Sequence, residues 1–95
     1  MSESLMDGRV CVITGANSGI GFVTARELAR MGAKVVMVCR NGEKCDAAKS
    51  AIVKATGNTV DTIIADLASF DSVRRLVKEL QSKYEKIHVL INNAG

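Results

Sequence analysis

The stretch Thr14-Gly15-Ala16-Asn17-Ser18-Gly19-Ile20-Gly21 decides how the rest of the chain is interpreted. It follows a short β-branched apolar run at residues 10–13, which is typical of a buried strand. It precedes residues 20–31, whose apolar positions recur at helical spacing. Glycines between a strand and a helix are typical of a loop that binds phosphate groups. The alternative is a glycine-rich turn with a purely structural role.

Each glycine of this stretch has a physical role in that context. Gly15 allows the chain to turn sharply off the strand. Gly19 lacks the Cβ that would keep a pyrophosphate from the free N–H groups at the helix N-terminus. Gly21 lets the helix pack close to the sheet. The spacing therefore favours a dinucleotide site between the first strand and the first helix.

Buried runs and amphipathic segments alternate along the remaining chain. Apolar runs at residues 35–39, 60–65 and 89–91 predict three further strands. Gly32 is expected to end the first helix and Gly57 the second, and Ser69 to cap the third. The expected core-facing stripes are Ile20, Val23, Leu28 and Met31, then Cys45, Ala48, Ile52 and Ala55, then Phe70, Val73, Leu76, Val77 and Leu80. This β-α-β-α-β-α-β alternation predicts an α/β fold in which helices pack on a parallel sheet.

Composition excludes several classes of protein. The 13 basic residues are scattered among 10 acidic ones and aromatics are 3% of the chain, so no nucleic acid is expected as a partner. Three cysteines without C-x-x-C spacing argue against a disulfide framework or a metal site and favour a reducing compartment. No apolar run is long enough for a membrane segment, and the first residues lack a secretory signal. The expected localisation is cytoplasmic.

Two motifs together carry a resemblance to a known family. Thr14-Gly15-x-x-x-Gly19-x-Gly21 and the closing Asn92-Asn93-Ala94-Gly95 resemble the N-terminal half of a short-chain dehydrogenase/reductase. Residues 39–41 and 88–95 resemble its retinol dehydrogenase and WW-domain oxidoreductase branch. The resemblance implies a three-layer, Rossmann-type, doubly wound parallel sheet of which only the first β-α-β-α-β-α-β portion is present, with strand order 3-2-1-4. Residues 1–95 would be the N-terminal part of an NAD(P)-binding domain.

The end of the second expected strand selects the cofactor. Folds that prefer NAD place an acidic side chain there for the ribose 2′-hydroxyl. This chain has Cys39 and then Arg40, whose planar fork of donors suits the 2′-phosphate of NADP. Asn41 and Lys44 are placed to assist. We therefore expect NADP rather than NAD, the alternative being that Arg40 is only a solvated surface residue.

Further contacts are implied by the resemblance. Asp66 would accept a hydrogen bond from adenine and Leu67 would add an apolar or backbone contact, although a turn aspartate is also a good interpretation of Asp66. Ala94 and Gly95 would let the ribose approach the strand end, while the Asn92 amide would mainly tie neighbouring strands together. The full set of expected cofactor-binding residues is Gly15, Asn17, Ser18, Gly19, Ile20, Gly21, Arg40, Asn41, Asp66, Leu67, Asn92, Ala94 and Gly95.

No catalytic residue is assigned in this chain. The family uses a tyrosine, a lysine four residues later and a serine, all beyond the Asn-Asn-Ala-Gly motif. Tyr84, the only tyrosine, is expected on the third helix and is followed four residues later by His88, so it does not match.

The expected function is the NADP(H)-binding portion of an oxidoreductase that transfers hydride between nicotinamide and an alcohol, aldehyde or ketone. The alternatives are a truncated, non-catalytic nucleotide-binding or interaction module, and an FMN- or phosphate-binding α/β module. Because residues 89–91 would form an exposed apolar edge strand, self-association through that edge is also expected.

Overall fold

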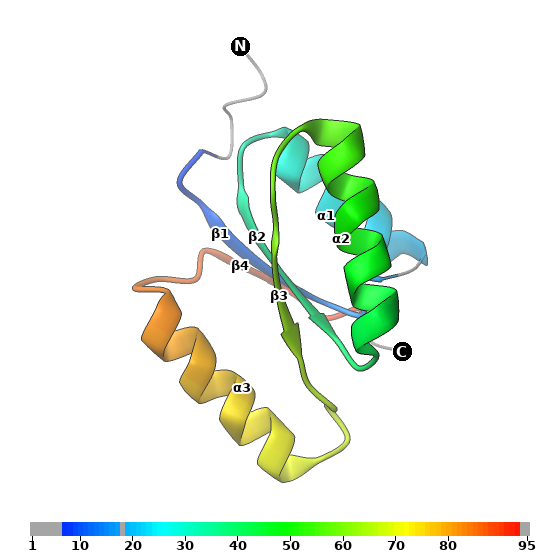
Figure 1. Ribbon diagram of the computed structural model, residues 1–95. Coiled ribbons are helices and arrows are strands. Elements are labelled where there is room, and N and C mark those ends of the chain that lie inside the picture. The colour runs from blue at the N-terminus through cyan, green and yellow to red at the C-terminus, as the bar shows by residue number, and fades with distance from the viewer. Residues whose placement is uncertain (1–6, 18, 94–95) are drawn as a thin grey trace.

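The computed structural model describes residues 7–17 and 19–93, and it shows a four-stranded parallel sheet with helices on both faces (Figure 1). Along the chain the elements are β1 (Val10–Thr14), α1 (Gly19–Arg30), β2 (Lys34–Cys39), α2 (Gly42–Thr56), β3 (Asp61–Ile64), α3 (Phe70–Lys83) and β4 (Val89–Ile91). The strand order is β3-β2-β1-β4, and all neighbouring strands pair in parallel. The predicted fold class and strand order are therefore confirmed.

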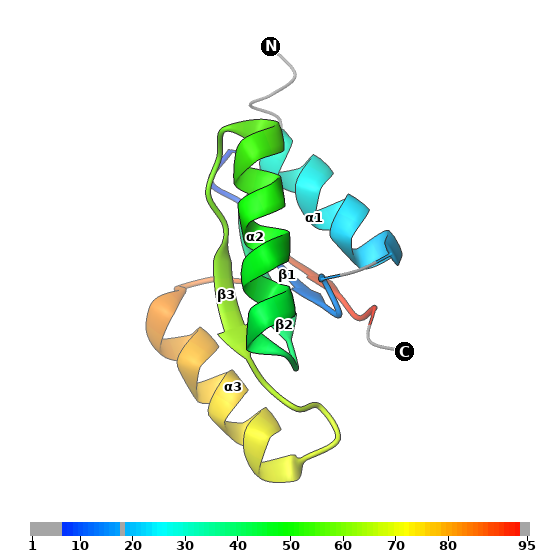
Figure 2. The same ribbon diagram turned by 45° about the vertical axis from the view of Figure 1, so that its right-hand side comes forward.

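The three layers follow from the two-residue period of the strands. Cys11 and Ile13 of β1 belong to a core shared with α1 and α2, whereas Val12 belongs to a second core shared with α3. Figure 2 shows α1 and α2 together on one side of the sheet, with α3 on the other. The apolar residues of the central strands β1 and β2 alternate between the two cores, because helices cover both faces of these strands.

Local sequence signals set the helix ends. Asn41 precedes α2, and its side chain accepts a hydrogen bond from the Lys44 backbone N–H at 3.0 Å. Gly57 ends the same helix with φ of 76°, and its N–H donates to the Val53 carbonyl. Ser69 caps α3 by accepting from the Ser72 N–H at 3.3 Å. The predicted roles of Gly57 and Ser69 are confirmed.

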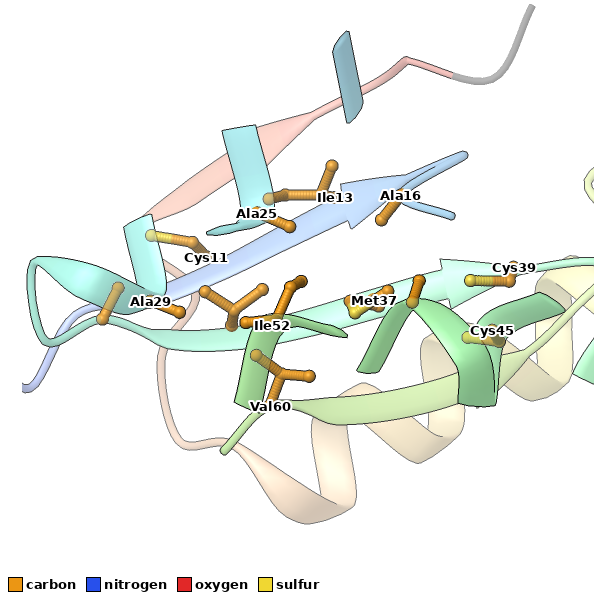
Figure 3. Packing of buried hydrophobic residues seen from close by; sticks show 13 residues of the cluster. Cys11, Ile13, Ala16, Ala25, Ala29, Met37, Cys39, Cys45, Ile52 and Val60 are labelled. Carbon is orange, nitrogen blue, oxygen red and sulfur yellow. The ribbon is translucent and has the colours of Figure 1, made fainter. Parts of the chain in front are cut away.

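The expected apolar stripe of α1 is wrong at Ile20 and Val23, whereas Leu28 packs against the core as predicted. Ile20 is 77% exposed and Val23 is 45% exposed, while Gly21, Ala25 and Ala29 are buried. A stripe of small residues lets the helix axis approach the sheet and α2 closely, as Figure 3 shows for the two alanines. The large residues are therefore displaced toward the sides of the helix, where solvent reaches them.

The expected stripes of the other helices need smaller corrections. In α2, Cys45, Ala48 and Ile52 are buried as predicted, but Ala55 is exposed. In α3, the buried face consists of Ser72, Leu76 and Leu80, whereas Phe70 and Val77 are exposed. The buried Ser72 lies next to the turn that follows β3, and its Oγ accepts a hydrogen bond from the Asp66 N–H at 2.7 Å.

The last strand lies at one edge of the sheet. β4 pairs with β1 in the register Cys11 with Val89 and Ile13 with Ile91. His88 extends this pairing, since its N–H donates to the Val10 carbonyl at 2.9 Å and its Nδ1 accepts from the Val10 N–H at 3.0 Å. Leu90 points away from the first core and is 68% exposed. Among the helices of the described residues, none combines the length and apolar character that crossing a bilayer requires.

Candidate functional site

A pocket of about 660 Å³ opens at the carboxyl ends of β1, β2 and β3. Its lining residues are Gly15, Asn17, Gly19, Ile20, Val38, Arg40, Asn41, Lys44, Ala65, Asp66, Leu67, Ala68 and Asn93. They come from the end of β2, from the first turns of α1 and α2, from the loops after the first three strands and from the segment after β4. Open parallel sheets bind ligands at this end of their strands. Eight of the residues expected from the sequence are therefore brought together: Gly15, Asn17, Gly19, Ile20, Arg40, Asn41, Asp66 and Leu67.

The loop between β1 and α1 has the backbone shape that its glycines allow. Gly15 and Gly19 have positive φ values of 61° and 60°. Gly19 is the first residue of α1, and a Cβ placed there would meet no atom within 4 Å. The N-terminus of α1 therefore faces open space in the pocket, where its free N–H groups attract anions.

Gly21 lies behind the pocket rather than in its lining. A Cβ on Gly21 would come within 2.4 Å of the Gly15 carbonyl oxygen and 2.5 Å of the Asn93 Nδ2. The close packing predicted for this position is thus a contact between α1 and the turn formed by Gly15. A side chain at position 21 would therefore displace the turn formed by Gly15 or the side chain of Asn93.

The residues after β4 are tied to the end of β1 through Thr14. The Thr14 hydroxyl donates to Asn92 Oδ1 at 3.0 Å and accepts from the Asn93 N–H at 2.8 Å. Asn92 does not line the pocket, in agreement with the strand-tying role expected for its amide. Asn93 does line it, and its Nδ2 donates to the Gly15 carbonyl at 3.4 Å. Asn93 was missed from the sequence, although it lies in the same closing motif.

Two cationic side chains line the pocket near the end of β2, one from the residue after the strand and one from the first turn of α2. Arg40 and Lys44 both line it, and Arg40 is exposed. The side-chain oxygen of Asn41 is already used to cap α2, so this residue contributes mainly by fixing the loop. None of the lining residues contributed by β2 or α2 is acidic. This side of the pocket is therefore electropositive.

Cys39 does not line the pocket. Its side chain is 2% exposed and lies beside Cys45 in the core below α2 (Figure 3). Burial raises the pKa of the Cys39 thiol to about 12, and its hydrogen bond to Cys45 adds to the rise. The thiol therefore stays protonated at neutral pH.

Asp66 forms the turn after β3. Its Oδ1 accepts from the Ala68 N–H at 3.0 Å and its carbonyl accepts from the Ser69 N–H at 3.0 Å. The turn role left open by the sequence is therefore present, and the same residue also lines the pocket beside Leu67.

Three expected site residues, Ser18, Ala94 and Gly95, lie outside the described part of the chain. Tyr84 directly follows α3 instead of lying within it, and it does not line this pocket. Among residues 7–17 and 19–93, no group of three or more histidine, cysteine or acidic side chains is arranged to hold a metal ion.

A family model described as short chain dehydrogenase matches residues 9–95. The chain belongs to the short-chain dehydrogenase family. It is 42% identical over 95 residues to human retinol dehydrogenase 13, with 99% of this chain and 29% of the relative covered. This chain therefore spans less than a third of that relative's length.

Solved structures of the family superpose closely on this short-chain dehydrogenase chain. The citronellol catabolism dehydrogenase of Pseudomonas aeruginosa PAO1 gives a TM-score of 0.90 at 40% identity, covering 97% of this chain and 38% of its own. A short-chain dehydrogenase from Escherichia coli CFT073, complexed with NADPH, gives 0.91 at 31% identity, covering 100% and 40%. The family is an oxidoreductase family with a Rossmann-type fold, and the architecture described above is its nucleotide-binding part.

Proposed function

We propose that residues 1–95 form the N-terminal, NADP(H)-binding part of a short-chain dehydrogenase/reductase. The parent reaction would transfer hydride between nicotinamide and a small alcohol, aldehyde or ketone. The observation that carries this proposal is the pairing of an open glycine turn at the N-terminus of α1 with two cations, Arg40 directly after β2 and Lys44 in the first turn of α2. Both features line one pocket.

The residues present fit a dinucleotide phosphate. The backbone of Gly15 and Gly19 leaves room for a pyrophosphate beside the first N–H groups of α1. Arg40 and Lys44 would hold the 2′-phosphate by charge-assisted hydrogen bonds. Structure neighbours complexed with NADP from Shigella flexneri and with NADPH from Escherichia coli support this choice over NAD.

The remaining cofactor contacts follow from the same lining. Asp66 and Leu67 would meet the adenine, and Asn17 and Ile20 would cover the phosphates. Asn92, Ser18, Ala94 and Gly95 complete the proposed set, with Asn92 acting by orienting the strand ends. When bound, the nicotinamide supplies or accepts the hydride. The task of this chain's own residues is to bind and orient the cofactor and to supply positive charge opposite its phosphates.

A second candidate is a nucleotide-binding module without turnover. It is favoured by one observation: the titratable residues that line the pocket are Arg40, Lys44 and Asp66, and none has the phenol or imidazole that carbonyl reduction uses as an acid. We expect the 95-residue chain to show no NADPH-dependent reduction of aldehydes or ketones. Turnover that is abolished by a substitution within this chain would contradict that expectation.

Cofactor titration tests the main proposal. Isothermal calorimetry should show tighter binding of NADP(H) than of NAD(H) by the 95-residue chain. Arg40→Ala should weaken NADP(H) binding by about ten- to a hundredfold and leave NAD(H) nearly unchanged. Lys54→Ala, on an exposed part of α2 outside the pocket, is the matched control. Equal binding of both cofactors, unaffected by Arg40→Ala, would overturn the NADP assignment.

A further inference from the structure

A second pocket lies at the opposite end of the sheet from the nucleotide pocket. Its volume is about 450 Å³, and it is lined by Lys34, Lys49, Asp61, Thr62, Lys83 and Tyr84. Lys34 and Asp61 are the first residues of β2 and β3, whereas the nucleotide pocket takes residues from near the other ends of these strands. We propose that this second pocket, named here the lysine pocket, binds a phosphate group.

The lysine pocket carries an excess of positive charge. Three ammonium groups face one carboxylate among its lining residues. The Asp61 carboxylate is already engaged, since its Oδ2 accepts a hydrogen bond from the Tyr84 hydroxyl and lies 3.7 Å from Lys34 Nζ. These two contacts offset part of its repulsion toward an incoming anion.

Of the three lysines, Lys49 is the one without an acidic partner among the described residues. Lys83 pairs with Glu79 at 2.9 Å, and Lys34 lies near Asp61. Lys49 makes no ion pair within residues 7–17 and 19–93, although it is only partly exposed. A phosphate in the lysine pocket would give Lys49 an ionic partner and would accept further hydrogen bonds from the other two ammonium groups.

Protection of a sheet edge does not explain this arrangement. β3 is an edge strand, and lysines on such strands discourage pairing with other chains. However, none of the three lysines lies on β3: Lys34 begins β2, Lys49 is on α2 and Lys83 ends α3. Figure 2 shows β3 at the outer edge, with α2 and α3 on its two sides. Three elements thus direct cations toward one hollow, which is the arrangement that an anion site requires.

The size and borders of the lysine pocket favour a compact anion over an extended polyanion. Asp61 and Glu79 lie at the pocket or beside it, so a nucleic-acid backbone passing over them would meet negative charge. A single phosphate group carries less charge past these carboxylates than a polyanion does, and it can accept hydrogen bonds from the lysines while Asp61 remains engaged by Tyr84 and Lys34. Such a group is present both in free inorganic phosphate and in the headgroup of phosphatidic acid.

The test is phosphate titration of the 95-residue chain followed by two-dimensional amide NMR. Inorganic phosphate should shift the Thr62 and Tyr84 amide signals as one saturable event, separate from any shifts at Gly19 in the nucleotide pocket. Lys49→Gln should weaken the event at Thr62 by roughly tenfold and leave the event at Gly19 unchanged. Lys54→Gln, on the same helix but outside the lysine pocket, should change neither.

A second lysine variant and a vesicle-binding comparison complete the test. Lys83→Gln should weaken the Thr62 event independently, which keeps the test decisive if Lys49→Gln fails to fold by circular dichroism. Phosphatidylcholine vesicles with and without phosphatidic acid distinguish the two sources of the phosphate group. Selective binding to the acidic vesicles that is lost in both lysine variants assigns the lipid headgroup. A response to inorganic phosphate alone assigns the free ion. No shift at Thr62 with either probe, or shifts unaffected by both lysine variants, would overturn the proposal.

Discussion

The Thr14 hydroxyl accepts a hydrogen bond from the Asn93 N–H at 2.8 Å, and this contact joins residues 79 positions apart in the chain. Thr14 ends β1, directly before the glycine turn, and Asn93 follows β4. The same hydroxyl donates to Asn92 Oδ1. One side chain of the first strand therefore sets the position of the residues that complete the nucleotide pocket.

Replacing this hydroxyl should cost stability. Thr14→Val keeps the shape of the side chain but leaves the Asn93 N–H and the Asn92 amide without these bonds, so we expect a loss of about 1–3 kcal/mol in the free energy of unfolding. Thr14→Ser keeps the hydroxyl and should lose less than about 1 kcal/mol. Urea denaturation measures both, and equal losses in the two variants would show that the hydrogen bonds contribute little.

Gly21→Ala should damage the glycine turn. The new Cβ would come within 2.4 Å of the Gly15 carbonyl oxygen, which is too close for a packed contact. We expect a loss of about 1–3 kcal/mol in unfolding free energy and weaker NADP(H) binding. Gly42→Ala is the control, because its Cβ would meet its nearest neighbour, Ile64 Cδ1, at 4.0 Å. Stability unchanged in both variants would contradict the close contact.

Stability should fall in alkali. The pKa of Cys39 is raised from its ordinary value of 9.0 to about 12, and burial followed by the hydrogen bond to Asp61 also raises that of Tyr84. Between pH 9 and pH 12 the unfolded chain has lost the Cys39 proton while the folded chain retains it. The Cys39 contribution to the free energy of unfolding is therefore complete below about pH 9, and it is lost by about 1.4 kcal/mol per pH unit as the pH rises toward 12.

The variant Cys39→Ala isolates this effect. Its stability should be lower at neutral pH because core volume is lost, yet its decline above about pH 9 should be shallower than that of the unchanged chain. Urea unfolding at several pH values provides the two slopes. Parallel slopes would mean that the Cys39 thiol does not contribute to the alkaline loss.

The exposed edge at β4 should drive self-association. Leu90 is 68% exposed on a strand whose outer side has no neighbouring strand among the described residues. Leu90→Lys should therefore shift sedimentation toward the monomer, since lysine on an edge strand opposes pairing. Val53→Lys changes an exposed apolar residue of α2, away from that edge, and should leave association unchanged. If both variants associate equally, the β4 edge is not the contact.

Much of the fold could be predicted because its signals are local. The first two strands contain the continuous apolar runs 10–13 and 35–39, and Ser69 and Gly57 mark helix ends whatever surrounds them. The face of α1 could not be predicted in this way. Hydrophobicity points to Ile20 and Val23, but the buried side is set by how closely the helix approaches its neighbours, which is a tertiary property.

The residues of the candidate site also differ in whether local sequence or tertiary contacts determine their place. The glycine turn and Arg40 were predictable because each directly follows an apolar run that predicts a strand. Asn93 was not, because its place in the lining depends on contacts to Thr14 and Gly15 from the far end of the chain. The burial of Cys39 was predictable, because this residue ends the apolar run at residues 35–39. Its neighbour Cys45 was not, because that contact depends on where α2 lies against the sheet.

The pairing of β1 with β4 also has a kinetic consequence. Contacts between residues almost a full chain length apart carry a large loop-closure entropy, so β4 is expected to dock late in folding. A ligand that binds only after Asn93 has reached the glycine turn stabilises the state in which β4 is docked, by its binding free energy. A bound dinucleotide would therefore lower the rate at which β4 detaches from β1. It would also protect the backbone amides of β1 from hydrogen exchange.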